Sequence, residues 1–165
     1  MKTYAVVITF NPDLEQFLKN FEAIANQVDR VIIVDNSDDI ICQNNLLEYF
    51  NEADNVTFVQ PKKNLGIAYA QNIGFLYAIK AGADFIITFD QDSSIQQGLI
   101  ETLYEEYTRI AETGINIACI GPSVINERNN SLYEKYFKNS KRINNSSYSV
   151  KSIISSGTLY NVDVF

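Results

Sequence analysis

Short apolar runs alternate with helical patterns along most of this chain, and this alternation restricts the fold more than any other feature. Val31–Val34 and Phe85–Phe89 are almost entirely apolar and rich in β-branched or aromatic residues, which predicts strands buried on both faces. Elsewhere apolar residues recur every three or four positions, as in Leu14–Val28. Strands and helices that alternate in this way form a mostly parallel sheet flanked by helices on both faces, so we predict an α/β fold.

The predicted elements fill one domain. Strands are predicted over Thr3–Phe10, Val31–Val34, Val56–Val59, Phe85–Phe89 and Ala118–Ile125, and helices over Leu14–Val28, around Leu46–Phe50, over Ile67–Ala81 and over Leu99–Ile110. Gly82 fits the C-terminal cap of the third helix. The sequence shows no internal repeat and no linker, and 165 residues suit one domain, so we predict a single unit over residues 1–165.

The segment from Asn126 to Ser149 differs in composition from the rest of the chain. It is rich in Asn and Ser, and its cations are Arg128, Lys135, Lys138, Lys141 and Arg142. We interpret it as a solvated excursion from the surface; the alternative is a mobile flap whose cations help to bind an anionic substrate. From Val150 to Val164 the pattern is strand-like again, and Ser155-Ser156-Gly157 predicts a bulge or a close approach of two backbones.

Charge and residue inventory exclude several classes of function. The formal net charge of −7 argues against non-specific nucleic-acid binding, which depends on Lys and Arg neutralising phosphates. The chain has no histidine, and its two cysteines, Cys42 and Cys119, are far apart in the sequence, which excludes a zinc site. Without histidine, histidine-dependent nucleophiles are excluded as well, and carboxylates are the natural general bases. No apolar stretch is long enough to span a bilayer and no signal pattern begins the sequence, so we expect a cytoplasmic protein with reduced cysteines.

Two carboxylates, Asp90 and Asp92, follow the apolar run Phe85–Phe89 in the sequence Asp-Gln-Asp-Ser. Ligands of open α/β sheets bind at the carboxyl ends of the strands. Alternate residues of an extended segment point the same way, so both carboxylates can converge on one cation while Gln91 faces away. Hard oxygen ligands suit Mg²⁺ or Mn²⁺, which in turn bind a diphosphate. Asp and Ser also form ordinary turns and helix caps, so this pattern alone is weak evidence.

Polar residues end two further strands and begin one helix. Thr9-Phe10-Asn11 follows the first predicted strand, Asp35-Asn36-Ser37 the second, and Asn64-x-Gly66 precedes the third helix. Each is explained by itself as a turn or cap. Together with Asp90 and Asp92 they predict a polar crevice with acceptors for a nucleobase and ribose and a metal pair for a diphosphate. The sequence has neither a dinucleotide-binding Gly-x-Gly-x-x-Gly nor a Gly-Lys-Ser/Thr phosphate loop.

Five segments in order resemble the motifs of family-2 inverting glycosyltransferases, and the resemblance covers nearly the whole chain. They are Val-Val-Ile-Thr-Phe-Asn-Pro (6–12), Ile-Ile-Val-Asp-Asn-Ser (32–37), Asn-Leu-Gly-Ile-Ala-Tyr-Ala-Gln-Asn-Ile-Gly (64–74), Phe-Asp-Gln-Asp-Ser (89–93) and Ser-Ser-Gly-Thr-Leu-Tyr (155–160). The Asp-Gln-Asp-Ser form is most similar to the bacterial rhamnosyltransferase branch. The resemblance implies a GT-A fold, a dTDP- or UDP-linked sugar donor and a glycan or lipid-linked acceptor.

The resemblance also implies roles for single residues. Thr9-Phe10-Asn11 would lie along the base and ribose, and Asp35 would accept a hydrogen bond from the pyrimidine. Asn64 and Gly66 would border the nucleotide. Asp90 would approach the ribose and the metal, and Asp92 would ligate the Mg²⁺ or Mn²⁺ that bridges the diphosphate. The sugar side of the site would be lined by Ser156 and Gly157.

The family's catalytic base is expected beyond Phe165. In the family an acidic residue removes the proton of the acceptor hydroxyl; it usually sits in a Glu-Asp or Asp-Asp pair about one helix after the Ser-Gly motif, and Asp163 comes too early to match it. We therefore expect a donor-binding half whose catalytic base and part of whose acceptor site lie further on. Family members often work at the inner face of the membrane, so peripheral membrane contact by the full-length protein is a further expectation.

Two other interpretations of the same residues stay open at this point. A haloacid-dehalogenase-type phosphatase also places Asp-x-Asp after an apolar strand, with the first Asp as nucleophile. However, Ser94 stands where that family normally has Thr or Val, and Asp90 follows three strand units instead of opening the sheet. The second alternative is an α/β module that binds a nucleotide or a partner without chemistry, since one fold hosts many functions.

Overall fold

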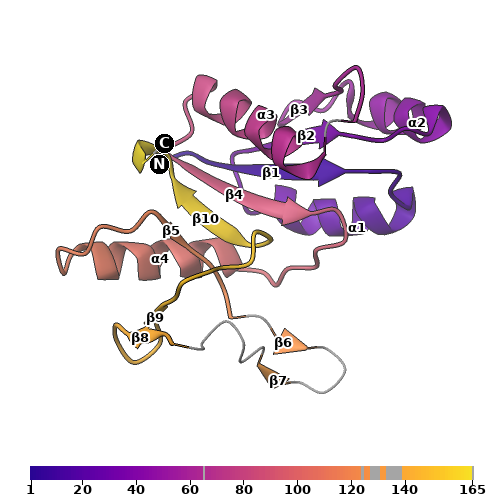
Figure 1. Ribbon diagram of the computed structural model, residues 1–165. Helices are drawn as coiled ribbons and strands as arrows, with labels where there is room; N and C mark the ends of the chain where they lie inside the picture. The colour runs from indigo at the N-terminus through magenta and orange to yellow at the C-terminus, as the bar shows by residue number, and fades with distance from the viewer. Residues whose placement is uncertain (65, 124, 127–130, 133–138, 165) are drawn as a thin grey trace.

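A central six-stranded sheet organises the computed structural model, which describes residues 1–64, 66–123, 125–126, 131–132 and 139–164 (Figure 1). Its strand order is β3-β2-β1-β4-β10-β5. The bounds are β1 (Thr3–Thr9), β2 (Arg30–Asp35), β3 (Val56–Val59), β4 (Phe85–Asp90), β5 (Cys119–Ile120) and β10 (Thr158–Asn161). The first four in that order pair in parallel, and β10 runs antiparallel to both β4 and β5. The predicted mostly parallel sheet is confirmed.

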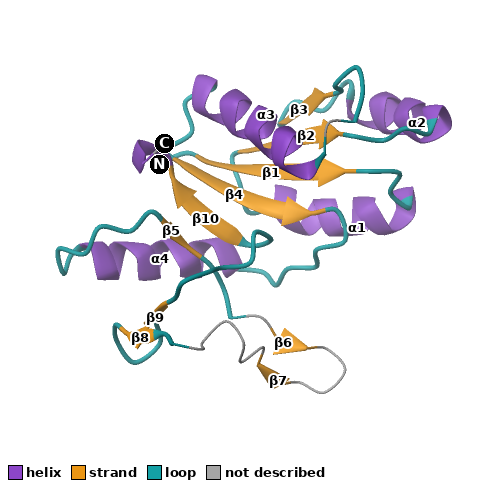
Figure 2. Ribbon diagram, viewed as in Figure 1, coloured by secondary structure: helices purple, strands orange, loops and turns teal. Residues whose placement is uncertain are grey.

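Helices cover both faces of this sheet, as predicted (Figures 1 and 2). They are α1 (Leu14–Ala25), α2 (Ile40–Phe50), α3 (Ile67–Lys80) and α4 (Leu99–Ala111). One buried cluster joins the sheet to α1, α2 and α4, and a second joins the other face to α3. The side chains of Asp13 and Asp39 cap α1 and α2 by accepting from the backbone N–H groups of Gln16 and Cys42. Within the described ranges, no helix is long and apolar enough to cross a membrane.

Strand β1 distributes its side chains to the two faces in alternation. Ala5 and Val7 belong to the cluster under α1, whereas Val6 and Ile8 belong to the cluster under α3. Helix α3 lies so close to β1 that a Cβ added at Gly74 would be 2.3 Å from Cγ1 of Val6. This close packing brings the start of α3 to the edge where the parallel strands end.

The predicted strand over Ala118–Ile125 is wrong in its extent. The segment forms β5 and, separately, β6 (Ile125–Asn126), which pairs with β7 (Ser131–Leu132) in a different sheet. Pro122 lies between them, and because proline has no N–H to donate, it interrupts a strand ladder. Arg128, Lys135 and Lys138, the first cations of the predicted excursion, lie outside the described residues.

The next hairpin is attached to the body of the protein. It consists of β8 (Lys141–Arg142) and β9 (Tyr148–Ser149), and its turn contacts α4. Glu106 of α4 accepts hydrogen bonds from Asn144 Nδ2 (2.8 Å) and from the Ser147 hydroxyl, and it forms an ion pair with Arg109. Arg142 donates to the backbone of its own turn. For the described part, these contacts favour a surface excursion over a free flap.

The chain enters β10 through a point of close backbone contact. Gly157 has a φ of +80°, its N–H donates to the Thr88 carbonyl at 2.7 Å, and an added Cβ would lie 3.1 Å from Pro122. The predicted close approach at Ser155-Ser156-Gly157 is confirmed, although it precedes β10 and is not a bulge within it. After β10 the strand-like pattern ends in a 3₁₀ turn, η2 (Val162–Val164), so it is shorter than predicted.

Candidate functional site

A pocket of about 410 Å³ opens at the carboxyl ends of β1, β2 and β4 and the start of α3. Its volume falls in the range of small-ligand sites, roughly 300–1,000 Å³. The lining residues are Ile8, Thr9, Phe10, Asn36, Asn64, Gly66, Ile67, Asp90, Gln91 and Asp92. The parallel register explains why distant segments meet here, because Thr9 is opposite Asp35 on one side and Ile8 is opposite Asp90 on the other.

Asp90 and Asp92 form an uncompensated pair of carboxylates in this pocket. Asp90 is half-buried and Asp92 is exposed. Burial first, and then the negative charge of Asp92, raise the pKa of Asp90 above its ordinary value. No Lys or Arg among the described residues forms an ion pair with either. Two close carboxylates without a cation are the arrangement that a divalent metal ion stabilises.

The turn that carries these carboxylates is fixed at both ends. The Asp90 N–H donates to the hydroxyls of Ser93 (3.1 Å) and Ser156 (3.3 Å), and the Ser93 N–H donates to the Asp90 carbonyl at 3.0 Å. Gln91 also lines the pocket, but its amide binds the backbone of Phe10, accepting from the N–H at 2.7 Å and donating to the carbonyl at 3.3 Å. Gln91 therefore joins the ends of β4 and β1 and leaves the two aspartates for a ligand.

The chemistry of the pair fits Mg²⁺ or Mn²⁺. Within the described ranges, no group of three or more His, Cys, Asp or Glu side chains could hold a metal ion. The protein would supply two carboxylates, Asp90 and Asp92, and the other ligands would come from phosphate oxygens and water. Mg²⁺ is commonly bound in this way, by one or two carboxylates together with substrate phosphates.

Asp35 lies beneath the pocket and is not among its lining residues. It is 1% exposed, and its Oδ1 accepts from the Thr9 hydroxyl (2.9 Å) and from both the N–H (3.1 Å) and the hydroxyl (2.5 Å) of Ser37. Its Oδ2 accepts from Gln60 Nε2 at 3.1 Å. A carboxylate offers about four acceptor positions, so these donors nearly saturate it. Asp35 connects β1, β2 and the segment after β3.

Asn11 also holds strand ends together and does not line the pocket. It has a φ of 43° and its Nδ2 donates to Asp38 at 2.6 Å, while its Oδ1 accepts from the N–H groups of Asp38 and Asp39. Asn64 and Gly66, which were also singled out from the sequence, do line the pocket. Asn64 Oδ1 accepts from the Gly66 N–H at 2.8 Å and so shapes the entry to α3.

Sequence reasoning did not single out Asn36 as a site residue. Asn36 is 5% exposed, its backbone N–H donates to the Thr9 carbonyl at 2.8 Å, and its Nδ2 donates to the Gly66 carbonyl at 3.2 Å. The sequence places Asn36 next to Asp35 at the same strand end. The sequence offers one indication, because side chains alternate along a strand and neighbouring residues therefore lie on opposite sides. This alternation does not indicate on which side the pocket lies.

Ser156 and Gly157 lie beside the carboxylate turn but do not line the pocket. The Ser156 and Ser93 hydroxyls are 2.5 Å apart, and Gly157 is bound to the Thr88 carbonyl, as described above. The segment before β10 is thus attached to the end of β4 at two points. Any ligand on the Ser156 side of the turn would be next to Asp90.

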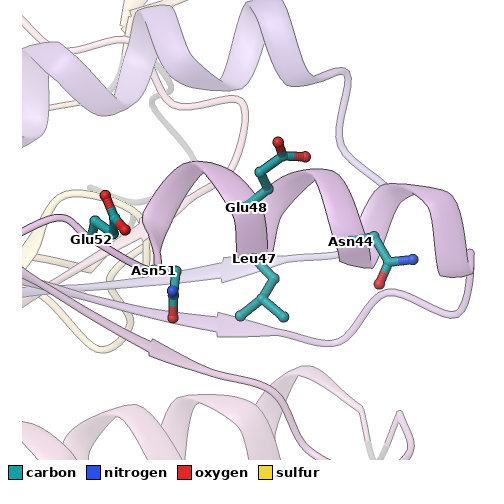
Figure 3. Close-up of a pocket in the computed structure, with 5 residues that line it drawn as sticks. All are labelled: Asn44, Leu47, Glu48, Asn51 and Glu52. Atoms are coloured by element: carbon teal, nitrogen blue, oxygen red, sulfur yellow. The ribbon is translucent and has the colours of Figure 1, made fainter.

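A second hollow lies along α2, away from these strand ends (Figure 3). It is lined by Asn44, Leu47, Glu48, Asn51 and Glu52, all from one helix and its end. The figure shows Glu48 pointing to one side of the helix and Leu47 to the other, so the side chains do not converge on a common point. The strand-end pocket is the better candidate for a site.

The model of the family described as Glycosyl transferase family 2 matches residues 4–165. The chain belongs to this family. It is 36% identical over 100 residues to the dTDP-rhamnosyl transferase RfbF of Shigella flexneri, an alignment that covers 61% of this chain and 32% of that protein. The chain thus matches about a third of the length of this curated relative.

Solved structures support the same assignment of the fold. Residues 1–349 of S. aureus TarS superpose with a TM-score of 0.66 at 19% identity, covering 99% of this chain and 48% of that one. A structure of GalNAc-T7 with UDP, GalNAc and Mn²⁺ superposes with a TM-score of 0.69 at 10% identity, covering 100% of this chain and 36% of that one. The family-2 chain therefore has the GT-A fold, and family membership decides against the phosphatase interpretation of Asp90.

Proposed function

We propose that this family-2 chain forms the donor-binding part of an inverting glycosyltransferase that uses a nucleoside diphosphate-linked sugar. The observation that carries the proposal is the uncompensated pair Asp90 and Asp92, in a pocket shared with the ends of β1 and β2 and the start of α3. The name of the Shigella relative favours dTDP-rhamnose as the donor. Glycans and lipid-linked saccharides are the acceptor classes we propose, with the reaction taking place in the cytoplasm or at the inner face of its membrane.

In this proposal different residues of the pocket contact different parts of the nucleotide. Asp90 and Asp92 would hold Mg²⁺ or Mn²⁺, and the bound ion would supply positive charge that stabilises the diphosphate as a leaving group. Thr9 and Phe10 form the wall at the end of β1, where the ribose would lie. Asn64 and Gly66 border the nucleotide at the start of α3.

Inversion requires a separate base for the acceptor. A single displacement at the anomeric carbon places the acceptor hydroxyl opposite the leaving diphosphate, so the group that removes its proton lies on the other side of the sugar. Asp90 and Asp92 are both on the diphosphate side. The base is therefore a carboxylate other than these two, and Ser156 and Gly157 would lie along the sugar between the two sides.

Calorimetric titration with dTDP, UDP and GDP, each with Mn²⁺ and with EDTA, tests the proposal. We expect binding of at least one pyrimidine nucleoside diphosphate that depends on the metal. GDP tests whether the pocket selects the base, and inorganic pyrophosphate tests whether the nucleoside contributes. Failure of all three nucleotides to bind with Mn²⁺ would contradict the donor site and favour a module without nucleotide chemistry.

A further inference from the structure

Gln91 extends the pairing of β1 with β4 beyond the point where the backbone ladder stops. The two strand ends lie side by side, and their last paired residues are Ile8 and Asp90 (Figure 1). One position further, the side-chain Oε1 of Gln91 accepts from the Phe10 N–H at 2.7 Å, and its Nε2 donates to the Phe10 carbonyl at 3.3 Å. A side-chain amide carries the same donor and acceptor as a peptide group. Gln91 therefore takes the place of one further strand residue.

These two hydrogen bonds hold the Phe10 backbone, while the Phe10 side chain is 45% exposed and lines the pocket. The next residue, Asn11, is bound to the other neighbouring strand end, because its N–H donates to the Ser37 hydroxyl at 2.8 Å. The end of β1 is therefore held from both sides, and Gln91 makes the connection on the β4 side. An exposed aromatic ring on a backbone fixed in this way forms a rigid wall for a ligand.

Gln91 stands between Asp90 and Asp92 in the chain, so its amide links the carboxylate turn to the Phe10 wall. The two aspartates are the proposed ligands of the metal that binds the diphosphate, and Phe10 would face the nucleoside. A diphosphate and a nucleoside that are joined in one molecule bind best when their two sites are already held at the matching distance. Loss of the Gln91 amide would leave both sites in place but release the spacing between them.

A direct contact between Gln91 and the diphosphate is the alternative, because Gln91 also lines the pocket. However, its Oε1 accepts from the Phe10 N–H and would repel a phosphate oxygen, and its Nε2 already donates to the Phe10 carbonyl. The geometry therefore favours a role through Phe10. The two roles differ in what they predict for inorganic pyrophosphate, which has no nucleoside.

We propose that Gln91 is a positioning residue that fixes Phe10 relative to the metal-binding turn and so sets how much the nucleoside adds to the affinity of the metal-bound diphosphate. This inference rests on the proposed nucleotide-sugar site. Gln91 acts through Phe10 and not on the diphosphate or the metal. The quantity that it controls is the ratio of the affinities for dTDP and for inorganic pyrophosphate, both measured with Mn²⁺.

Calorimetric titration of wild-type and Gln91→Met protein with both ligands measures this ratio. Methionine has nearly the length of glutamine but forms neither hydrogen bond. We expect Gln91→Met to bind pyrophosphate within about twofold of wild type and dTDP about tenfold more weakly, which corresponds to the loss of one or two hydrogen bonds. Gln97→Met replaces an exposed glutamine that follows the same turn, and this matched control should bind both ligands as wild type does.

A double-mutant cycle with Phe10→Ala tests whether the effect passes through the aromatic ring. Phe10→Ala alone should weaken the binding of dTDP and leave that of pyrophosphate within about twofold of wild type. Adding Gln91→Met to Phe10→Ala should then weaken dTDP binding by less than about twofold more, because the side chain that Gln91 positions is already absent. A further loss of about tenfold would show that Gln91 acts independently of Phe10 and would overturn the inference.

The outcomes separate this inference from the function on which it rests. If wild-type protein binds dTDP with Mn²⁺ but the affinity ratio is unchanged in Gln91→Met, the inference is overturned and the donor site stands. The same holds if wild-type protein binds dTDP no more tightly than pyrophosphate. If wild-type protein binds neither dTDP nor UDP, the proposed function fails as well. Thermal melts show whether each variant is folded, and Gln91→Ala, which also loses both hydrogen bonds, replaces Gln91→Met if that variant does not fold.

Discussion

Two strands of the sheet end in aspartate on either side of β1, and their surroundings are opposite. Asp35 at the end of β2 is 1% exposed and accepts from Thr9, Ser37 and Gln60. Asp90 at the end of β4 is half-buried, and burial, followed by the like charge of Asp92, raises its pKa. Donors of the protein itself fill the acceptor positions of Asp35, whereas no cation of the described residues compensates the charge of Asp90.

This difference shows that residue type and place in the sheet do not determine the role of a strand-end carboxylate. The number of donors that face it does. A carboxylate whose positions are filled by its own chain stabilises the fold, and removing it leaves unpaired donors. A carboxylate that lies next to another one, with no cation between them, makes the fold less stable. Its role is to bind a ligand. Substitutions at the two ends should therefore have opposite effects on stability and binding.

Asp35→Ala should have the largest effect on stability. The substitution leaves the Thr9 hydroxyl, the Ser37 N–H and the Gln60 amide without their acceptor, and we expect a loss of about 3 kcal/mol in the free energy of unfolding. Asp35→Asn keeps one oxygen and should lose less. Urea denaturation measures both, and an unchanged midpoint for Asp35→Ala would show that the network does not stabilise the fold.

Asp92→Ala should instead abolish metal-dependent binding with little change in stability. Loss of residues behind a metal ligand typically costs 10–100-fold in affinity, so loss of one of two protein ligands should weaken nucleotide binding with Mn²⁺ by at least about 100-fold. Asp54→Ala removes one exposed carboxylate from the turn before β3 and is the matched control. Calorimetry measures the affinity. Equal affinities for wild-type and Asp92→Ala protein would remove Asp92 from the metal site.

Much of the fold follows from the sequence because buried parallel strands leave an unmistakable pattern. Val31–Val34 and Phe85–Phe89 fall within β2 and β4, and the predicted strand Val56–Val59 has the same bounds as β3. The prediction failed where strands are too short to show periodicity. Ala118–Ile125 reads as one strand by composition, but Pro122 divides it, and the two halves belong to different sheets.

The site was predictable as a location but not as a set of contacts. The strand ends at Thr9 and Asp90 meet the start of α3, with Asn64 and Gly66, in one pocket because parallel strands end at a common edge. Which residue faces that pocket depends on the donors around it. Gln60 and Ser37 fill the positions of Asp35, and no local pattern in the sequence indicates that they do.

Asp90→Asn should stabilise the metal-free protein at neutral pH. Because the folded state raises the pKa of Asp90, the folded state binds that proton more tightly than the unfolded state does. The stability from this proton is present below the unfolded pKa of about 3.8 and is lost as the pH rises through the folded value. The variant should therefore be more stable than wild type at pH 7, by less than about 1 kcal/mol after solvent screening, and the difference should shrink toward pH 3.

Urea denaturation in EDTA at several pH values measures this difference. Asp54→Asn removes an exposed carboxylate and serves as the control for net charge. Addition of Mn²⁺ should reverse the order of stability at pH 7, because only wild-type protein keeps both ligands. If the difference in stability between Asp90→Asn and wild type is the same at pH 3 and pH 7, the folded state does not raise the pKa of Asp90.

The smallest expected effect comes from the contact that fixes the end of β4 and the turn that carries Asp90 and Asp92. Ser156→Ala removes the hydroxyl that contacts Ser93 and accepts from the Asp90 N–H, but Ser93 still accepts from that N–H. We expect a loss of about 0.5–1 kcal/mol in stability and a severalfold weaker affinity for nucleotide with Mn²⁺, because the turn bearing Asp92 is less firmly fixed. Ser94→Ala, on the exposed side of the same turn, should change neither. If Ser156→Ala lowers stability but leaves metal-dependent affinity intact, the segment before β10 stabilises the sheet but does not contribute to the metal site. The ends of β2 and β4 then differ only in their carboxylates.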